Sequence, residues 1–573
     1  MIAGENMKHY YTNEKNHQIL ISLLKQHNIR KIVASPGIAN CVFVGSIQDD
    51  SFFTIYSCVD ERSAAYMACG LALESNEPVV ISCTGATAAR NYMPGATEAF
   101  YGKLPVLIVT SSQPTCRTGH LFAQVTDRGC PPRDTCKVSL ELPLVDCDED
   151  AWACVVNANK AILELTRNGG GPAHLNLITP YKLSEEVALT CKDCIDARTI
   201  KRFCLGDKLP ELSAKKVAVF VGSHKKWNPE TVETVEKFCE ANNAVVLCDQ
   251  TSNYYGKYRI FYPLIINQSS LHKNKTPAYD MDILVHLGEI TGEENVPGMI
   301  KSKETWRVSE DGEIRDYFRN MSCVFEMTEK EFFAEYVNAE KDGRGVKNTY
   351  YNECVATYKN FESELPALME KMPFSNVWIA QKTAALLPRN STVVLSILNT
   401  LRTWNYAEFQ KPMNVFSPVG GFGIDGATSM LIGCSLASPD KNCYLITGDL
   451  AFFYDLNALG NRHIGNNVKI LLINNGIGVE FKKSYSFAYR ILGEDVAPYV
   501  AAEGHFGNKS PGLVKHYAHD LGFEYICASN KDEFEEVCKK FVFDEVSDRP
   551  LLFECFVDSN DESLALDIIH GRR

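Results

Sequence analysis

The feature that most constrains the fold of this chain is a repeated alternation of short apolar runs with amphipathic stretches, in three successive segments. This alternation is typical of parallel sheets in which each strand is followed by a helix. Helices cover both faces of such sheets, which explains why the runs are nearly all apolar. We therefore expect an α/β protein of three domains, each a mostly parallel sheet flanked by helices, over residues 1–190, 200–345 and 346–573.

The apolar runs place the individual strands. The first segment should open with a helix that begins after Asn13, which would be its N-cap. A helix is also expected over 229–241, and a charged helical stretch near 326–370 should lead into the third domain. Strands are expected at 32–34, 79–83, 106–110 and 174–178, then at 217–221, 245–248 and 283–287, and finally at 393–397, 415–416, 443–447 and 469–473.

Charge and cysteine content restrict the functional class. A net charge of -13 argues against nucleic acid as a partner, because phosphate binding needs a basic face. No apolar run approaches the roughly 20 residues that a membrane helix needs, and no signal peptide is visible. The 21 cysteines indicate reduced thiols and a cytoplasmic location. Cys191 and Cys194 have CxxC spacing but lack the second pair of a zinc site.

Polar residues follow two expected strands of the third segment. Gly448, Asp449 and Leu450 come after one strand, and Asn475 follows the next. Because parallel strands end at the same edge of a sheet, these residues should meet where ligands bind. Asp449, Asn475 and the carbonyl of Ile477 offer the oxygen ligands that Mg²⁺ or Mn²⁺ prefers. The same residue pairs also occur in ordinary turns.

A second motif in the same segment offers another interpretation. Residues 421–426 satisfy GxGxxG after a short strand and before an apolar helix, and Asp449 follows at about the distance of a ribose-binding acid. An NAD-dependent dehydrogenase is therefore an alternative. That interpretation leaves Asn475 and the whole first segment without a role.

The first segment bears on this choice. A helix opens at 60–63 with Asp-Glu-Arg-Ser, and it is followed by Thr-Gly-Ala-Thr at 84–87 and Asn-Tyr-Met-Pro-Gly at 91–95. Glu61 alone could simply be an acid near a helix N-terminus. The ordered set, however, resembles the pyrimidine-binding domain of thiamine-diphosphate (ThDP) enzymes. The stretch from Gly448 to Asn475 resembles their diphosphate-binding domain, so the resemblance spans nearly the whole chain.

Within that superfamily the chain is similar to the menaquinone-pathway SEPHCHC synthases, which join a 2-oxoglutarate-derived unit to isochorismate. The similar stretches are 34–37, 60–63, 399–401, 423–426 and 448–452. The resemblance implies ThDP and Mg²⁺ as cofactors and a homodimer or homotetramer. It also implies that Glu61 hydrogen-bonds the aminopyrimidine ring and that Ile424 supports the bent cofactor. The cofactor-binding set would be Glu61, Thr400, Ile424, Gly448, Asp449, Leu450 and Asn475.

The substrate-binding residues of that family are not matched. Where the family has arginines, this chain has Ile38-Ala39-Asn40, Trp404 and Val419, and its basic pair would fall near the acidic stretch 292–295. Each lost arginine removes a charge-assisted contact to a carboxylate. Gln124 falls where the family has a substrate-contacting glutamine. The candidate substrate contacts are Asn40, His120, Gln124, Arg402, Glu480 and Lys482.

The sequence therefore predicts a ThDP- and Mg²⁺-dependent enzyme, a transferase or lyase. It would decarboxylate a 2-oxo acid and transfer the acyl-anion equivalent to a carbonyl or unsaturated acceptor, with substrates other than those of SEPHCHC synthase. A simple 2-oxo acid decarboxylase is the alternative. His120 could also be an incidental loop residue, and Lys482 and Lys483 could be solvated.

Overall fold

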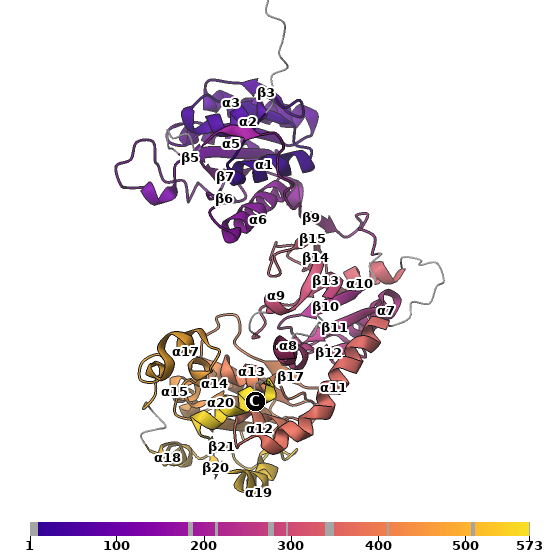
Figure 1. The fold of residues 1–573 in the computed structure, drawn as a ribbon, viewed down its shortest axis with the longest axis vertical. Coiled ribbons are helices and arrows are strands. Elements are labelled where there is room, and N and C mark those ends of the chain that lie inside the picture. Colours follow the sequence, from indigo (N-terminus) through magenta and orange to yellow (C-terminus); the bar gives the residue numbers. More distant parts are fainter. Residues whose placement is uncertain are drawn as a thin grey trace, which may run out of the picture. The chain divides into compact units, whose positions relative to one another are not determined.

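The computed structural model describes residues 10–180, 187–212, 216–272, 280–293, 296–338, 349–409, 412–505 and 510–571. The chain divides into two compact units (Figure 1). Unit 1 comprises Met1–Phe203 and Glu313–Val324, and unit 2 comprises Cys204–Gly312 and Phe325–Arg573. Within the described part of the chain, no helix combines the length and apolar character required to cross a bilayer.

Unit 1 is built on a six-stranded parallel sheet in the order β3-β2-β4-β5-β7-β6. Alternate side chains of its strands enter two separate apolar clusters, one on each face, which is why the expected strands are apolar throughout. Helices α1 (Lys15–Gln26) and α6 (Asp148–Glu164) cover one face, and α3 (Glu61–Ser75) and α5 (Met93–Tyr101) cover the other. The strands are β2 (Lys31–Ala34), β3 (Thr54–Ser57), β4 (Val79–Thr84), β5 (Val106–Ser112), β6 (Ser139–Leu142) and β7 (Ala173–Ile178).

The expected N-cap of α1 is wrong by one residue. Glu14 occupies the cap position, without a side-chain hydrogen bond to the helix. Asn13 instead exchanges hydrogen bonds with the backbone of Ala188. These bonds continue a small antiparallel ribbon of β1 (Tyr11–Thr12) and β8 (Leu189–Cys191). The local sequence predicted that the Asn13 side chain would cap the helix. It instead bonds to Ala188, which lies 175 residues away in the chain.

Unit 2 contains a parallel sheet with the order β12-β11-β10-β13-β14. Because β11 and β13 lie on opposite sides of β10, a topological switch point falls between β10 and β13. The division between the two units falls within β15 (Met321–Glu326) and within β9 (Lys201–Cys204). The other strands are β10 (Val217–Val221), β11 (Ala244–Cys248), β12 (Arg259–Phe261), β13 (Asp280–Leu287) and β14 (Lys301–Val308).

The charged stretch after this sheet is not a single connector. Helix α10 (Glu329–Asn338) packs Phe332 and Phe333 against Phe238 of α7 (Pro229–Asn242). It therefore covers the sheet, because burying two phenylalanines outweighs the charges on its outer face. Only α11 (Thr349–Lys371) leads from this sheet toward the next.

The second sheet of unit 2 has six parallel strands in the order β17-β16-β18-β19-β21-β20. Two apolar clusters again occupy its two faces. The predicted fold class of parallel sheets flanked by helices is thus confirmed. The strands are β16 (Thr392–Leu395), β17 (Asn414–Phe416), β18 (Cys443–Gly448), β19 (Val468–Asn474), β20 (Glu524–Ala528) and β21 (Leu551–Phe556).

Candidate active site

The carboxyl ends of β16, β18 and β19 lie side by side in unit 2. Helix α13 (Asn399–Trp404) follows β16, helix α15 (Asp449–Tyr454) follows β18, and Asn475 follows β19. The structure therefore brings Thr400, Asp449 and Asn475 to one sheet edge, as expected from the alternation of strands and helices.

Asp449 is a buried carboxylate that is only partly satisfied. It is 3% exposed, and its Oδ2 atom has no hydrogen-bond partner among the described residues. Burial raises the pKa of Asp449 to about 7, although the backbone amides of Leu450 and Gly476 act in the opposite direction. A buried, unpaired carboxylate oxygen is unfavourable unless it binds a proton or a cation. The site thus fits a divalent cation.

The turn after β19 supplies further oxygens. Asn475 is half-buried, and its Oδ1 accepts a hydrogen bond from the amide of Ile477 at 3.2 Å. Gly476 has a positive φ of 72°, which lets the chain fold back at this point. The carbonyl of Ile477 accepts from Val479 at 2.9 Å, so one lone pair remains for a metal.

The start of α13 holds strain and another unsatisfied group. Leu398 has φ 66° and ψ -125°, a backbone conformation that is unfavourable for a residue with a side chain. The Oδ1 atom of the following Asn399 is buried and has no partner among the described residues. Such strain and unsatisfied polarity concentrate at ligand-binding sites.

Gly448 faces Thr400 across this edge. Its φ of -84° suits any residue, and an added Cβ would lie 3.8 Å from Thr400 Oγ1, an ordinary contact. The fold of the chain alone therefore does not require glycine here. Close approach of a phosphate to the backbone would require it.

The glycine-rich stretch lies in a different setting from a dinucleotide fingerprint. It follows β17, an edge strand, whereas the switch point of this sheet lies between β16 and β18. Ile424 is half-buried against the apolar core, and Gly426, with φ 84°, precedes α14 (Ala427–Ala437). The position of this motif disfavours the dehydrogenase alternative.

Two of the expected substrate contacts bind each other. Arg402 forms an ion pair with Glu480, and its Nε donates to the carbonyl of Gly292 at 3.1 Å. Lys483 completes the cluster at 2.8 Å from Glu480 Oε2, with its side chain only 3% exposed. Lys482 is also largely buried and lies 3.4 Å from Ser559 Oγ. Neither lysine is therefore simply solvated.

At two of the positions where the similar family has arginine, this chain has a buried apolar residue. Trp404 is fully buried and donates through Nε1 to Asn376, and Val419 lies in the same apolar core. Of the acidic stretch 292–295, Glu294 and Asn295 lie outside the described residues. Glu293 is buried and accepts from Asn405 at 2.6 Å, and burial raises its pKa to about 7. Sequence inspection missed Glu293 and Lys483, because neither belongs to a motif.

In unit 1, Glu61 is the first residue of α3, which Asp60 caps by accepting from the amide of Arg62. Asn91 donates to Glu61 Oε2 at 3.3 Å. The negative charge of Glu61 adds to the effect of burial in raising the pKa of Cys83, so the carboxylate lies near the end of β4. Glu61 itself is partly exposed, and unit 1 does not enclose it in the apolar pocket that its role would need.

The other three candidates in unit 1 differ in their surroundings. Asn40 is buried and uses its polar atoms within the protein, donating to the carbonyl of Ser35 and accepting from Ser82 and Ser111. His120 and Gln124 are exposed on the loop after β5, where Gln124 has a positive φ of 63°. Asn40 thus holds strand ends together, whereas His120 and Gln124 face outward.

No metal site forms at the CxxC pair. The described residues contain no group of three His, Cys, Asp or Glu side chains that could hold a metal. Cys191 and Cys194 are not disulfide-bonded, and the Cys194 thiol donates to the carbonyl of Gln18.

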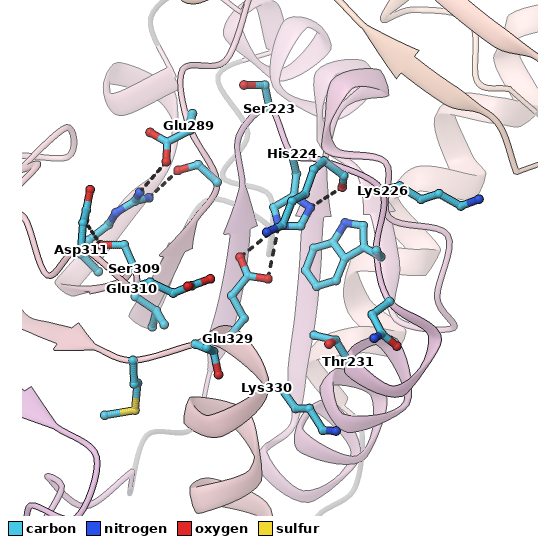
Figure 2. A pocket seen from close by; sticks show the side chains of 18 residues that line it. Ser223, His224, Lys226, Thr231, Glu289, Ser309, Glu310, Asp311, Glu329 and Lys330 are labelled. Atoms are coloured by element: carbon cyan, nitrogen blue, oxygen red, sulfur yellow. Dashed lines mark hydrogen bonds and ion pairs between the residues drawn. The ribbon is translucent and has the colours of Figure 1, made fainter. Parts of the chain in front are cut away.

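A separate cavity of about 550 Å³ opens at the switch point of the other sheet of unit 2. Figure 2 shows His224 bonded to Glu329 at its centre, with Glu289, Glu310 and Asp311 on one side and Lys226 on the other. The cavity is lined by as many carboxylates as lysine and arginine side chains. One of these, the buried Arg307, donates to the carbonyl of Gly288. None of the site residues that the sequence predicted lines this cavity.

Comparison with known proteins identifies two matching domains. The N-terminal TPP-binding domain of thiamine pyrophosphate enzymes matches residues 15–129, and the C-terminal TPP-binding domain matches residues 399–555. The chain is 29% identical to a 2-succinyl-5-enolpyruvyl-6-hydroxy-3-cyclohexene-1-carboxylate synthase of Phocaeicola vulgatus, over 98% of this chain and 99% of the relative. It is 28% identical to the Bacteroides fragilis synthase of the same name, over 97% and 98%.

Proposed function

Since the chain belongs to the thiamine-diphosphate-dependent enzymes and is similar to SEPHCHC synthases, we propose that it decarboxylates a 2-oxo acid with Mg²⁺ or Mn²⁺ as its metal. The acyl-anion equivalent would pass to a carbonyl or unsaturated acceptor. Residues 1–190 would bind the pyrimidine, 346–573 the diphosphate, and 200–345 would form the middle domain. The cysteines, none in a disulfide, are consistent with a cytoplasmic location.

The single observation that carries the metal and diphosphate assignment is the unsatisfied Oδ2 of Asp449 at the β18 edge. Asn475 and the carbonyl of Ile477 would complete the protein share of an octahedral shell. Gly448, Leu450 and Thr400 would line the diphosphate, and Ile424 would support the bent cofactor.

The bound cofactor supplies a carbanion at C2 of its thiazolium ring and an electron sink for decarboxylation. Glu61 would hold the proton that the aminopyrimidine ring exchanges, which requires a carboxyl in a water-poor pocket. Asn91, which donates to Glu61 at 3.3 Å, would orient that carboxyl.

The partial exposure of Glu61 supports a site completed by a second copy of the chain. Helix α14 carries no charged residue, and its Met430 and Leu436 are exposed, as are Tyr66 and Leu73 of α3. Large exposed apolar side chains on such helices favour association. We propose a homodimer, or a dimer of dimers, in which Glu61 of one chain and Asp449 of another serve one cofactor.

The substrates should differ from those of SEPHCHC synthase. Arg402 is paired to Glu480, and Trp404 and Val419 are core residues, so none of them replaces the family's substrate arginines. Among the other candidates, exposed His120 and Gln124 would contact a substrate directly. Lys482 and Asn40 are bonded within the protein and would position neighbouring residues.

Calorimetry of the purified protein tests the cofactor assignment. ThDP should bind tightly with Mg²⁺ and weakly without it, and NAD should not bind. A screen of 2-oxo acids for CO₂ release, with and without aldehyde or ketone acceptors, then separates carboligation from simple decarboxylation. Tight NAD binding without ThDP binding would overturn the proposal.

A further inference from the structure

We infer that Arg90 and Arg128 of unit 1 form an anion-binding pair that holds a substrate carboxylate which is retained through the reaction. This inference rests on the proposed function. It identifies a basic pair that motif comparison overlooks, because neither residue occupies a position where the similar family carries its substrate arginines.

Arg128 is a largely buried cation that forms no ion pair with a carboxylate in the part of the chain that the structure describes. Arg128 is 8% exposed, and the two hydrogen bonds that its guanidinium donates go to neutral oxygens. Nε donates to Asn176 Oδ1 at 3.2 Å, and NH1 donates to Thr126 Oγ1 at 3.1 Å. The charge of Glu141 acts to raise the pKa of Arg128, but the contact between the two side chains runs through Asn176, whose Nδ2 donates to Glu141 at 3.1 Å. Burial lowers the pKa of Arg128, and an anion beside the guanidinium would favour its charged form.

Arg90 lies beside Arg128 and adds a second positive charge. It is exposed on α4 (Ala88–Asn91), and its NH2 donates to the carbonyl of Asp127 at 2.6 Å. Because Asp127 directly precedes Arg128, this bond brings Arg90 to the segment that carries Arg128, and the charge of Arg90 contributes to lowering the pKa of Arg128. Neither forms an ion pair with a carboxylate of the described residues, and adjacent like charges are unfavourable unless an anion joins them.

The chain makes room for Arg128 at one glycine. A Cβ added to Gly85 would lie 2.6 Å from Arg128 NH1, so the guanidinium packs directly against this glycine and would have to shift if Gly85 carried a side chain. Gly85 follows β4 in the Thr-Gly-Ala-Thr stretch. A glycine that leaves room for a guanidinium at a strand end is consistent with a binding group.

The pair lies at the same edge as Glu61. The Arg128 guanidinium packs against Gly85, which directly follows β4, and the charges of Glu61 and Arg128 both act on the pKa of Cys83 in that strand. Asn91, which donates to Glu61, is the neighbour of Arg90. The loop that carries Arg128 also carries Gln124. A substrate at Glu61 would therefore lie within reach of the pair.

Chemistry decides which carboxylate the pair would hold. The carboxylate of a 2-oxo acid that departs as CO₂ loses its charge, so guanidinium contacts to it would stabilise the ground state and slow the reaction. Contacts to a carboxylate that stays are equally favourable before and after this step. The pair therefore indicates a second acidic group, either at the far end of the donor or on the acceptor.

The test uses the dimeric holoenzyme with ThDP and Mg²⁺. Donors of equal chain length that end in a carboxylate or a methyl group are compared, and acceptors are compared in the same way. Arg128→Gln and Arg90→Gln should each reduce kcat/KM for the acidic member of a pair by about 10- to 100-fold, the range for a charge-assisted contact. Values for the uncharged member should remain unchanged. If the variants lose the preference for acidic donors, the bound carboxylate belongs to the donor. If they lose the preference for acidic acceptors, it belongs to the acceptor.

Two further variants separate binding from folding. Gly85→Ala keeps both charges but displaces the guanidinium, and it should reproduce the loss, whereas Arg128→Lys should recover part of it. Arg30→Gln serves as the matched control, because Arg30 is an exposed arginine before β2 at the opposite edge of the sheet. An unchanged preference for acidic substrates in Arg90→Gln and Arg128→Gln would refute the pair.

Binding of glutarate to the holoenzyme, measured by calorimetry without turnover, keeps this test independent of the proposed reaction. If no 2-oxo acid is decarboxylated but glutarate binds and both variants weaken it at least 10-fold, the pair stands and the reaction fails. If the reaction is observed and neither glutarate binding nor substrate preference depends on the two arginines, the pair fails alone.

Discussion

Replacing Asp449 with asparagine should stabilise the protein without metal and abolish its cofactor binding. The rise of the Asp449 pKa from 3.8 to about 7 means that ionising this carboxyl costs about 4 kcal/mol more in the folded chain than in the unfolded chain. Since the unfolded chain releases this proton first, stability falls as pH rises from about 4 to about 7 and is then constant. Asp449→Asn removes this loss. The gain should be about 1–3 kcal/mol at pH 8, because the new amide leaves a buried donor to satisfy.

The assay is urea unfolding of both proteins in a metal chelator at pH 8 and at pH 4. The variant should be the more stable protein at pH 8, and the difference should nearly vanish at pH 4, where the wild-type carboxyl is protonated. With ThDP and Mg²⁺ at pH 8 the order should reverse, since only the wild type gains the stabilisation that ligand binding gives the folded state.

Asp455→Asn is the matched control. Asp455 is also buried, but its oxygens accept from the amide and hydroxyl of Ser429 at 2.7 and 2.9 Å. Its replacement should destabilise the protein at pH 8, with or without metal. An Asp449→Asn protein that is less stable than wild type in the chelator, or that still binds ThDP in a Mg²⁺-dependent manner, would refute the reasoning.

Four further predictions concern the reaction and the assembly. Glu61→Gln should retain ThDP binding but slow C2-proton exchange of the cofactor, followed by NMR, by orders of magnitude; wild-type exchange would remove Glu61 from the mechanism. The pair 2-oxoglutarate and isochorismate should be poor substrates in a coupled assay, and efficient SEPHCHC formation would show that other basic residues have taken over. Glu480→Gln should lower stability by about 3–5 kcal/mol in urea unfolding, because it leaves Arg402 and Lys483 as buried cations; a neutral effect would show that the cluster is hydrated. Mixing inactive Glu61→Gln with inactive Asp449→Ala subunits should restore part of the activity, and no recovery despite proven subunit exchange would mean that each chain builds its own site.

The strands that the sequence predicted are those whose apolar character is local. Val217–Val221 was predicted with its observed bounds, and the strands that lead to Asp449 and Asn475 were each extended by one or two residues. Strands β20 and β21 were not predicted. Glu554 interrupts the apolar run of β21, and it is tolerated there because Asn474 and Tyr525 donate to it. Those donors come from strands on either side, so the pattern of β21 itself carries no sign of them.

The candidate site divides in the same way. Asp449, Asn475 and Thr400 could be placed together because each directly follows a strand, and parallel strands end at one edge. The sequence could not predict whether an arginine is ion-paired within the protein, because its partner lies far along the chain. Glu480 is 78 residues from Arg402, and Asn176 is 48 residues from Arg128. Before folding, both arginines are equal candidates for a substrate anion. Folding neutralises Arg402 against a carboxylate and leaves Arg128 against an amide, and this difference, rather than the presence of arginine, decides which of them can bind an anion.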